Sequence, residues 1–286
     1  MKWELTQEQE KYICDNYHFK TSTALGKELE VPPSKISNVW YKYGYKNKLR
    51  RLYSLNDEYF SNIENENQTY ILGFLMSDGT IYKKDNGQDI LRWQIHKTDR
   101  HILEDFKIEF ETDKPIMTCG GSYVSLEIVS NKIVKDLERL GVTERKTYGN
   151  TIINFENDLL MLSFIRGYID GDGHVNSKNK KISISGYQNN MSKIQSFLET
   201  RNIFSTFFVD KRKINPINND KFGELTFNKT QTYCLLKSLK YEECNMLKLE
   251  RKTKSALEII RSIEDSSKIS DKEIVLYYKY AVQKLS

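Results

Sequence analysis

The sequence contains few of the residues that staple secreted domains or ligate structural zinc. Only four cysteines occur in 286 residues, no two of them form a Cys-x-x-Cys pair, and no histidine stands at zinc-finger spacing from them. Neither a disulfide framework nor a structural zinc is therefore supported. Long apolar runs are also absent: none approaches the roughly 18 residues that cross a bilayer, and the first residues lack the apolar core of a signal peptide. These absences predict a soluble intracellular protein.

The composition is that of a globular protein with a small excess of positive charge. Hydrophobic residues make up 38% of the chain, aromatic residues 12% and charged residues 29%, and there are only four prolines. At this length the chain can form two domains, each with its own core. The net charge of +5 is by itself too small to identify a partner.

The positive charge is concentrated between Lys35 and Arg51. This stretch holds six basic residues and no acidic one, with Trp40 and three tyrosines between them. Basic residues interleaved with aromatic ones are typical of a surface that binds a phosphate backbone. The alternative is a solvated helix face, which would normally mix both signs of charge.

Three short helices are predicted around this basic stretch. Capping residues and apolar spacing indicate helices over 5–17, 21–29 and 34–43, the last ended by Gly44. A basic third helix after a turn is typical of a helix-turn-helix module, whose last helix enters the major groove. Such three-helix patterns also occur in protein-binding modules, and the basic charge favours DNA. The predicted DNA contacts are Ser34, Lys35, Asn38, Tyr41, Lys42, Lys46, Lys48 and Arg50.

Two later segments read almost alike, Ile71–Gly79 and Ile165–Gly173. Each is an apolar helical stretch with a glycine in its middle and an Asp-Gly ending, and the final acids, Asp78 and Asp172, lie 94 residues apart (172 minus 78). A motif that occurs twice predicts two copies of one unit. We expect the two copies to bring their carboxylates together, and paired carboxylates of this kind usually hold metal ions.

The elements around the two motifs also repeat. In each copy the pattern predicts a helix, two strands, a helix, two strands and a helix, and each copy closes on Glu-Arg-Lys-Thr, at 144–147 and 250–253. The predicted fold class is α+β, with tandem pseudo-symmetric αββαββα repeats preceded by a small all-α module. The expected domains are a helix-turn-helix over 1–51, a linker over 52–68, repeat one over 69–150, repeat two over 151–262 and a C-terminal helix over 263–286.

These features resemble the LAGLIDADG homing endonucleases in their single-chain form with two motifs. The resemblance covers about residues 69–260 and leaves the N-terminal module outside it. The second copy matches the family motif closely, whereas Met76 in the first copy stands where the family has its first acid. The resemblance implies a double-strand break in DNA with short 3′ overhangs, in which each active site cuts one strand.

The resemblance also implies roles for individual residues. Asp78 and Asp172 would be the catalytic metal ligands, and the backbone carbonyls of Ser77 and Gly171 would ligate the metal as well. The expected cofactor is Mg²⁺ or another divalent cation such as Mn²⁺.

The residue types give a physical reason for a metal at this place. Gly73 and Gly167 lack side chains, so the two helices can approach closely and bring their acidic ends to one point. Two carboxylates beside two helix C-termini repel each other, and a divalent cation removes that repulsion. Oxygen ligands suit a hard cation, and a pair of such ions can activate water and stabilise the leaving oxygen of a phosphodiester.

The two Glu-Arg-Lys-Thr segments offer one lysine per copy, Lys146 and Lys252. Family members carry a lysine at about this place, so the resemblance implies a catalytic role near the scissile phosphates. The alternative is that both lysines only contact the phosphate backbone. A Glu-x-Lys pair also belongs to a different nuclease constellation, but no upstream Pro-Asp accompanies either pair.

Alternating strands supply the predicted base-reading surface. Over 91–96 apolar residues alternate with polar ones, and a sheet with one polar face can lie in the major groove. A strand side that only faces solvent would have the same pattern. The predicted contacts are Gln94, His96 and Arg100 in the first copy and Lys181, Ser183, Ser185 and Gln188 in the second. None of His96, His101 and His174 has a partner at metal-ligand spacing.

The sequence thus predicts a site-specific endonuclease that cuts double-stranded DNA as a monomer, since both halves of the site lie on one chain. Neither a membrane nor a small-molecule substrate is expected. The predicted location is the cytoplasm of a bacterium, as a host or phage protein, or its nucleoid. A DNA-binding regulator that keeps the fold without cleavage is the first alternative, and Met76 suits it. An RNA maturase is the second, and a module suited to duplex DNA disfavours it.

Overall fold

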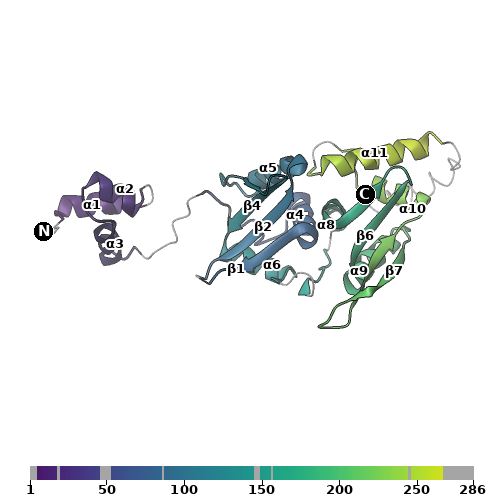
Figure 1. Cartoon of the computed structure of the whole chain (residues 1–286), viewed down its shortest axis with the longest axis horizontal. Coiled ribbons are helices and arrows are strands. Elements are labelled where there is room, and N and C mark those ends of the chain that lie inside the picture. The colour runs from purple at the N-terminus through teal and green to yellow at the C-terminus, as the bar shows by residue number, and fades with distance from the viewer. Residues whose placement is uncertain are drawn as a thin grey trace. The chain divides into compact units, whose positions relative to one another are not determined.

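Two compact units make up the chain, Met1–Ser54 and Leu55–Ser286 (Figure 1). The computed structural model describes residues 5–17, 20–45, 53–85, 87–144, 149–155, 157–243 and 246–266. No helix in these ranges is both long and apolar enough to cross a membrane.

The N-terminal unit consists of three helices, as predicted. They are α1 (Gln7–Asp15), α2 (Ser22–Glu28) and α3 (Pro33–Lys42). Thr6 caps α1 with a reciprocal capping box: the Thr6 hydroxyl accepts from the backbone N–H of Gln9, and the Gln9 side chain accepts from the backbone N–H of Thr6. The small core is formed by one apolar face of each helix, and it contains Ile13, Leu25, Ile36, Val39 and Trp40.

Repeat one begins with the first motif helix and continues into an antiparallel sheet. Its elements are α4 (Glu66–Asp78), β1 (Gly79–Lys83), β2 (Asp89–His96), the 3-10 turn η1 (Lys97–Asp99), α5 (Arg100–Glu109), β3 (Met117–Cys119), β4 (Tyr123–Val129) and α6 (Asn131–Arg139). The strand order is β1-β2-β4-β3.

Repeat two has the same sequence of elements and the same sheet topology. Its elements are α8 (Asp158–Asp172), β5 (Gly173–Asn176), β6 (Lys181–Tyr187), α9 (Gln188–Glu199), β7 (Thr206–Ile214), β8 (Lys221–Thr226) and α10 (Lys229–Ser238), followed by α11 (Glu250–Glu264). The order β5-β6-β8-β7 repeats that of the first sheet strand for strand. The predicted fold class, tandem αββαββα repeats, is therefore confirmed.

Each sheet has one buried face and one open face. In β2 the side chains of Leu91, Trp93 and Ile95 are buried, and the polar residues between them are more exposed. The helices α5 and α6 pack against β2, and α9 and α10 pack against β6. Because helices cover one side of each sheet, the alternating polar residues lie on the other.

The predicted linker is shorter in the structure than in the sequence pattern. Residues from Leu55 onward belong to the second unit, and Tyr59 and Phe60 are buried in its core. The motif helix α4 already begins at Glu66. Because 52–68 is polar and acidic overall, its composition gave no indication that Tyr59 and Phe60 pack against Phe110. Most of the predicted C-terminal helix over 263–286 lies outside the described residues.

Candidate metal and DNA site

The two motif helices, α4 and α8, lie in direct backbone contact at the centre of the second unit (Figure 1). A Cβ atom added to Gly73 would lie 2.0 Å from the carbonyl oxygen of Phe164, and one added to Gly167 would lie 2.0 Å from that of Tyr70. These distances are far shorter than van der Waals contact, so only glycine fits at either position. The predicted close approach through Gly73 and Gly167 is therefore present, and it is reciprocal.

The acidic ends of the two helices meet. Asp78 and Asp172 are the last residues of α4 and α8, and both side chains are exposed. A Cβ atom added to Gly171 would lie 1.7 Å from Oγ of Ser77 and 3.4 Å from Cβ of Asp78. The backbone just before Asp172 thus touches the end of α4. Two carboxylates from opposite repeats stand beside two helix C-termini, whose partial negative charge adds to theirs.

Lys252 places a cation under this junction. It lies in the first turn of α11 and is 6% exposed, and its Nζ donates to the carbonyl oxygens of Ile169 (2.7 Å), Asp170 (2.7 Å) and Gly171 (2.9 Å). Burial lowers the pKa of Lys252 to about 8, although the charges of Asp170, Asp78 and Asp172 act in the opposite direction. The lysine therefore caps the C-terminal end of α8 within the field of both motif acids. Its predicted counterpart, Lys146, lies outside the described residues.

A buried polar network in the second copy was not predicted from the sequence. Asp170 accepts hydrogen bonds from the hydroxyls of Tyr70 (2.7 Å) and Tyr241 (3.0 Å) and from the backbone N–H of Leu249 (2.9 Å). Burial raises the pKa of Asp170, and the hydrogen bonds from Tyr70 and Leu249 act against that rise. The guanidinium of Arg166 lies 5.4 Å and 5.6 Å from the ring centroids of Tyr70 and Tyr241.

This network is asymmetric between the repeats. At the position of Asp170 the first copy has Met76, which is also buried. The network nevertheless joins both repeats, because Tyr70 belongs to α4. The sequence held a signal for it: Arg166 and Asp170 are charged residues four positions apart in the mainly apolar interior of the helix, which places them on one helix face.

A small hollow opens beside the acidic ends. It has a volume of about 140 Å³ and is lined by residues of both motifs and of the second sheet, among them Met76, Ser77, Tyr168, Asp172 and Ser185. The second-copy acid thus faces a space that also touches the end of α4. A ligand in this space would contact both repeats.

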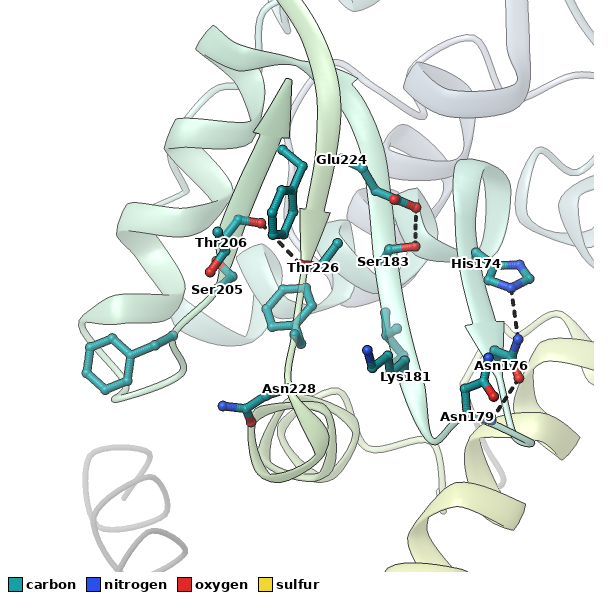
Figure 2. A pocket seen from close by; sticks show the side chains of 14 residues that line it. His174, Asn176, Asn179, Lys181, Ser183, Ser205, Thr206, Glu224, Thr226 and Asn228 are labelled. Atoms are coloured by element: carbon teal, nitrogen blue, oxygen red, sulfur yellow. Dashed lines mark hydrogen bonds between the residues drawn. The ribbon is translucent and has the colours of Figure 1, made fainter. Parts of the chain in front are cut away.

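The predicted base-reading residues of the second unit lie around the open sheet faces. Gln94 and His96 are exposed on β2, and Arg100 is exposed at the start of α5, where it pairs with Glu104 (2.9 Å). In the second copy, Lys181 and Ser183 line a larger hollow of about 610 Å³ on the sheet, which Figure 2 shows. Two others lie elsewhere. Ser185 lines the small hollow, and Gln188 begins α9 half-buried.

The predicted contacts of the N-terminal unit share the exposed side of α3. Ser34, Lys35, Asn38, Tyr41 and Lys42 are all exposed. The ammonium of Lys42 pairs with the carboxylate of Glu10 on α1 at 2.8 Å. The remaining predicted contacts, Lys46, Lys48 and Arg50, lie outside the described residues.

The donor set at the junction fits a hard divalent cation. The described residues contain no group of three or more His, Cys, Asp or Glu side chains that could hold a metal. The donors at the junction are instead two carboxylates and the carbonyl oxygens at two helix ends, which are all oxygen ligands of the kind that Mg²⁺ takes together with water. The carbonyl of Gly171 already accepts from Lys252, and a carbonyl oxygen has a second lone pair.

In a comparison with protein families, one part of the chain matches a family model. Residues 160–239 match the model of a LAGLIDADG-like domain, which covers the second motif and most of repeat two. A search of curated proteins finds no match. The matched segment runs from α8 to the end of α10 and includes the second copy of the motif.

Among solved structures, the chain is similar to three DNA complexes of homing endonucleases or meganucleases. I-SmaMI bound to uncleaved DNA target in the presence of calcium ions is 12% identical, over 77% of this chain and 98% of that one, with a TM-score of 0.46. The LAGLIDADG homing endonuclease I-GzeII in complex with DNA target is 12% identical, over 80% of this chain and 97% of that one, with a TM-score of 0.46. I-LtrWI, a LAGLIDADG homing endonuclease bound to target DNA, is 14% identical, over 79% of this chain and 97% of that one, with a TM-score of 0.46.

Proposed function

Since residues 160–239 match the model of a LAGLIDADG-like domain, we propose that the chain is a site-specific endonuclease that makes a metal-dependent double-strand break in a long DNA target. The observation that carries the proposal is the meeting of Asp78 and Asp172 at the joined ends of α4 and α8. A protein that only binds DNA gains nothing from two clustered carboxylates, because they repel phosphate.

In this proposal the chain holds the cation and positions the strands. Asp78 and Asp172, with the carbonyls of Ser77 and Gly171, would hold Mg²⁺ or Mn²⁺. Such an ion supplies an activated water and stabilises the leaving oxygen of the phosphodiester. Lys252 neutralises the end of α8, so that Asp172 can approach a phosphate with less repulsion. Lys146 would have the corresponding place in the first copy.

DNA would lie across the open faces of the two sheets. Gln94, His96 and Arg100 would contact one half of the target, and Lys181, Ser183, Ser185 and Gln188 the other. The exposed side of α3 would add contacts outside this core and lengthen the target. One chain supplies both halves of the site, so it acts as a monomer.

The test is cleavage of supercoiled plasmid that carries the DNA flanking the chain's own gene. With Mg²⁺ the protein is expected to give linear plasmid, and with a chelator none. Asp78→Asn and Asp172→Asn should each abolish linearisation while binding persists, because an amide keeps the side-chain shape and loses the charge that holds the cation. Asp113→Asn, the same change at an exposed loop position, should cut like wild type. Linear product from the double variant Asp78→Asn/Asp172→Asn would refute the proposal.

A DNA-binding regulator without cleavage is the second candidate. Met76 favours it, because the first copy lacks the acid that Asp170 supplies in the second. Specific binding of the flanking DNA with no nicked or linear product in Mg²⁺ or Mn²⁺ would select this candidate.

A further inference from the structure

The larger hollow on the second sheet has an apolar wall. Phe208 on β7 is 60% exposed and Phe204, just before that strand, is 50% exposed, and both line the hollow of about 610 Å³. Burying a phenylalanine ring stabilises a protein, and a ring that stays exposed to water does not contribute this stabilisation. We call Phe204 and Phe208 the apolar wall, and both rings are available to contact a ligand in the hollow.

Strand register places the apolar wall beside polar groups on the same open face. Phe208 pairs with Glu224, which in turn pairs with Ser185 across the neighbouring strand. The next row contains Thr206, Thr226 and Ser183, in that order across the sheet. Residues directly opposite in an antiparallel sheet point to the same side. The hollow therefore combines apolar and hydrogen-bonding side chains on one surface, as Figure 2 shows for its polar members.

Hydrogen bonds hold the polar members in place. The hydroxyl of Ser183 donates to Glu224 at 2.5 Å, and the hydroxyl of Thr226 donates to the carbonyl of Thr206 at 3.4 Å. The side chain of Asn176 similarly accepts from the backbone N–H of Asn179 (3.0 Å). These contacts fix the floor of the hollow without covering Phe208.

The corresponding face of the first sheet has a different chemistry. There Arg92 donates to the side chain of Gln94 (2.5 Å) and lies 3.6 Å from the carboxylate of Glu127. The ring of His96 packs edge-on against Tyr123 at 5.9 Å. On the same face Met117 on β3 is 57% exposed and Tyr123 on β4 is 47% exposed, because Met117 pairs with Ser125, which lies opposite Gln94. The first face thus combines charged and amide groups with a thioether and a phenol, whereas the second carries two exposed phenylalanine rings.

Charge identifies the class of occupant. Lys181 is exposed in the hollow, and Lys211, Arg212 and Lys213 are exposed along the continuation of β7. An apolar wall beside basic residues suits a polyanion that also presents an apolar group. In the major groove of duplex DNA the apolar group on a base edge is the C5 methyl of thymine.

We propose that the second sheet reads thymine, and that Phe208 is the residue that contacts its C5 methyl. This inference rests on the proposed function, since it requires DNA on the open sheet faces. It assigns methyl contact to the half of the target that faces β7. Specificity for thymine over cytosine then comes from a group that makes no hydrogen bond.

The experiment removes only the methyl group. A target is first selected from random duplexes with the full-length protein, and deoxyuridine then replaces thymidine in one half at a time. Burying one methyl group contributes enough free energy to change affinity roughly fourfold. We expect the dissociation constant of the wild type to rise about that much for each thymine that Phe208 contacts, and these thymines should all lie in one half of the target.

Two variants separate methyl contact from general binding. Phe208→Ala should bind thymine and uracil targets equally, because the ring that contacts the methyl is gone. Its side chain is exposed, so the melting temperature should stay close to that of wild type. Lys181→Ala should weaken binding to the thymine and uracil targets by the same factor, and this variant should still bind the uracil target less tightly than the thymine target.

The outcomes distinguish this inference from the proposed function. Equal binding of thymine and uracil targets by wild type, or undiminished sensitivity in Phe208→Ala, would overturn the inference and leave cleavage untouched. If the protein binds uracil targets less tightly than thymine targets but never cuts DNA, the inference is supported and the proposed endonuclease activity is refuted. A protein that selects no duplex would overturn both.

Discussion

At the scale of single residues, the second unit contains a cluster of buried charged side chains whose hydrogen bonds satisfy one another. Asp170 is 1% exposed and accepts three hydrogen bonds, and Lys252 donates three to the end of the same helix. A buried charge left without partners would cost several kcal/mol in unfolding free energy. The partners come from both repeats and from the segment before α11, so the cluster ties three parts of the chain together.

Lys252 gives this cluster a measurable pH dependence. Its pKa is about 8 in the folded chain and 10.5 ordinarily. Between these values the unfolded chain binds more protons at this residue than the folded one, so its contribution to the free energy of unfolding rises with pH. In metal-free buffer, the difference in unfolding free energy between wild type and Lys252→Met should increase from about pH 7.5 to 10.

The control for this prediction is another lysine on α11. Lys254 is exposed, and Lys254→Met should shift the unfolding free energy by the same amount at every pH in the series. Urea unfolding followed by circular dichroism measures both. A difference for Lys252→Met that stays flat or falls as pH rises would contradict the burial of a charged lysine at this place.

The sequence identified the motif acids but not their supporting contacts. Asp78 and Asp172 stand out because a repeated motif marks them. The partners of Asp170 do not, because Tyr241 and Leu249 lie 71 and 79 positions further along the chain. No local pattern reports which distant residue will cover a helix end, so the three carbonyl bonds of Lys252 were equally hidden.

At the scale of elements, the glycine pair sets the distance between α4 and α8. Glycine in a helix interior is unfavourable by about 1 kcal/mol relative to alanine. Here packing reverses that preference, because a Cβ at either Gly73 or Gly167 would lie 2.0 Å from a carbonyl oxygen of the other helix. We expect Gly73→Ala and Gly167→Ala each to lower the unfolding free energy by about 2 kcal/mol as the helices are forced apart.

Urea unfolding of the two glycine variants checks this, with Lys254→Ala on the surface of α11 as a neutral control. Alanine variants as stable as wild type within about 0.5 kcal/mol would mean that the helices are not in contact there. The same variants should also lose cleavage, because separated helix ends cannot share a cation.

Boundaries were less predictable than the elements themselves. The sequence predicts strands over 204–209 and 224–227, whereas β7 runs to Ile214 and β8 begins at Lys221. Beyond Val209 the hairpin is exposed and basic, so it lacks the alternation of apolar residues that marks a half-buried strand. Because both strands are longer than predicted, the open face of the second sheet is also larger than the sequence pattern indicated.

At the scale of the whole molecule, two units with separate cores divide the proposed work. The N-terminal core is formed by three helices, and the second unit has one continuous core that spans both repeats. In the second unit the motif helices α4 and α8 contact each other through their backbones, and each repeat contributes one sheet. In the proposed function, cleavage would therefore belong to the second unit, and the first unit would add target length.

The central claim is that Asp78 and Asp172 hold cations together at the junction of the two repeats. The most direct measurement is an anomalous diffraction map of the full chain crystallised with its selected DNA and Mn²⁺. We predict manganese peaks bounded by both carboxylates, next to the DNA backbone. Manganese bound elsewhere, or two aspartates that turn to separate faces of the protein, would contradict the account.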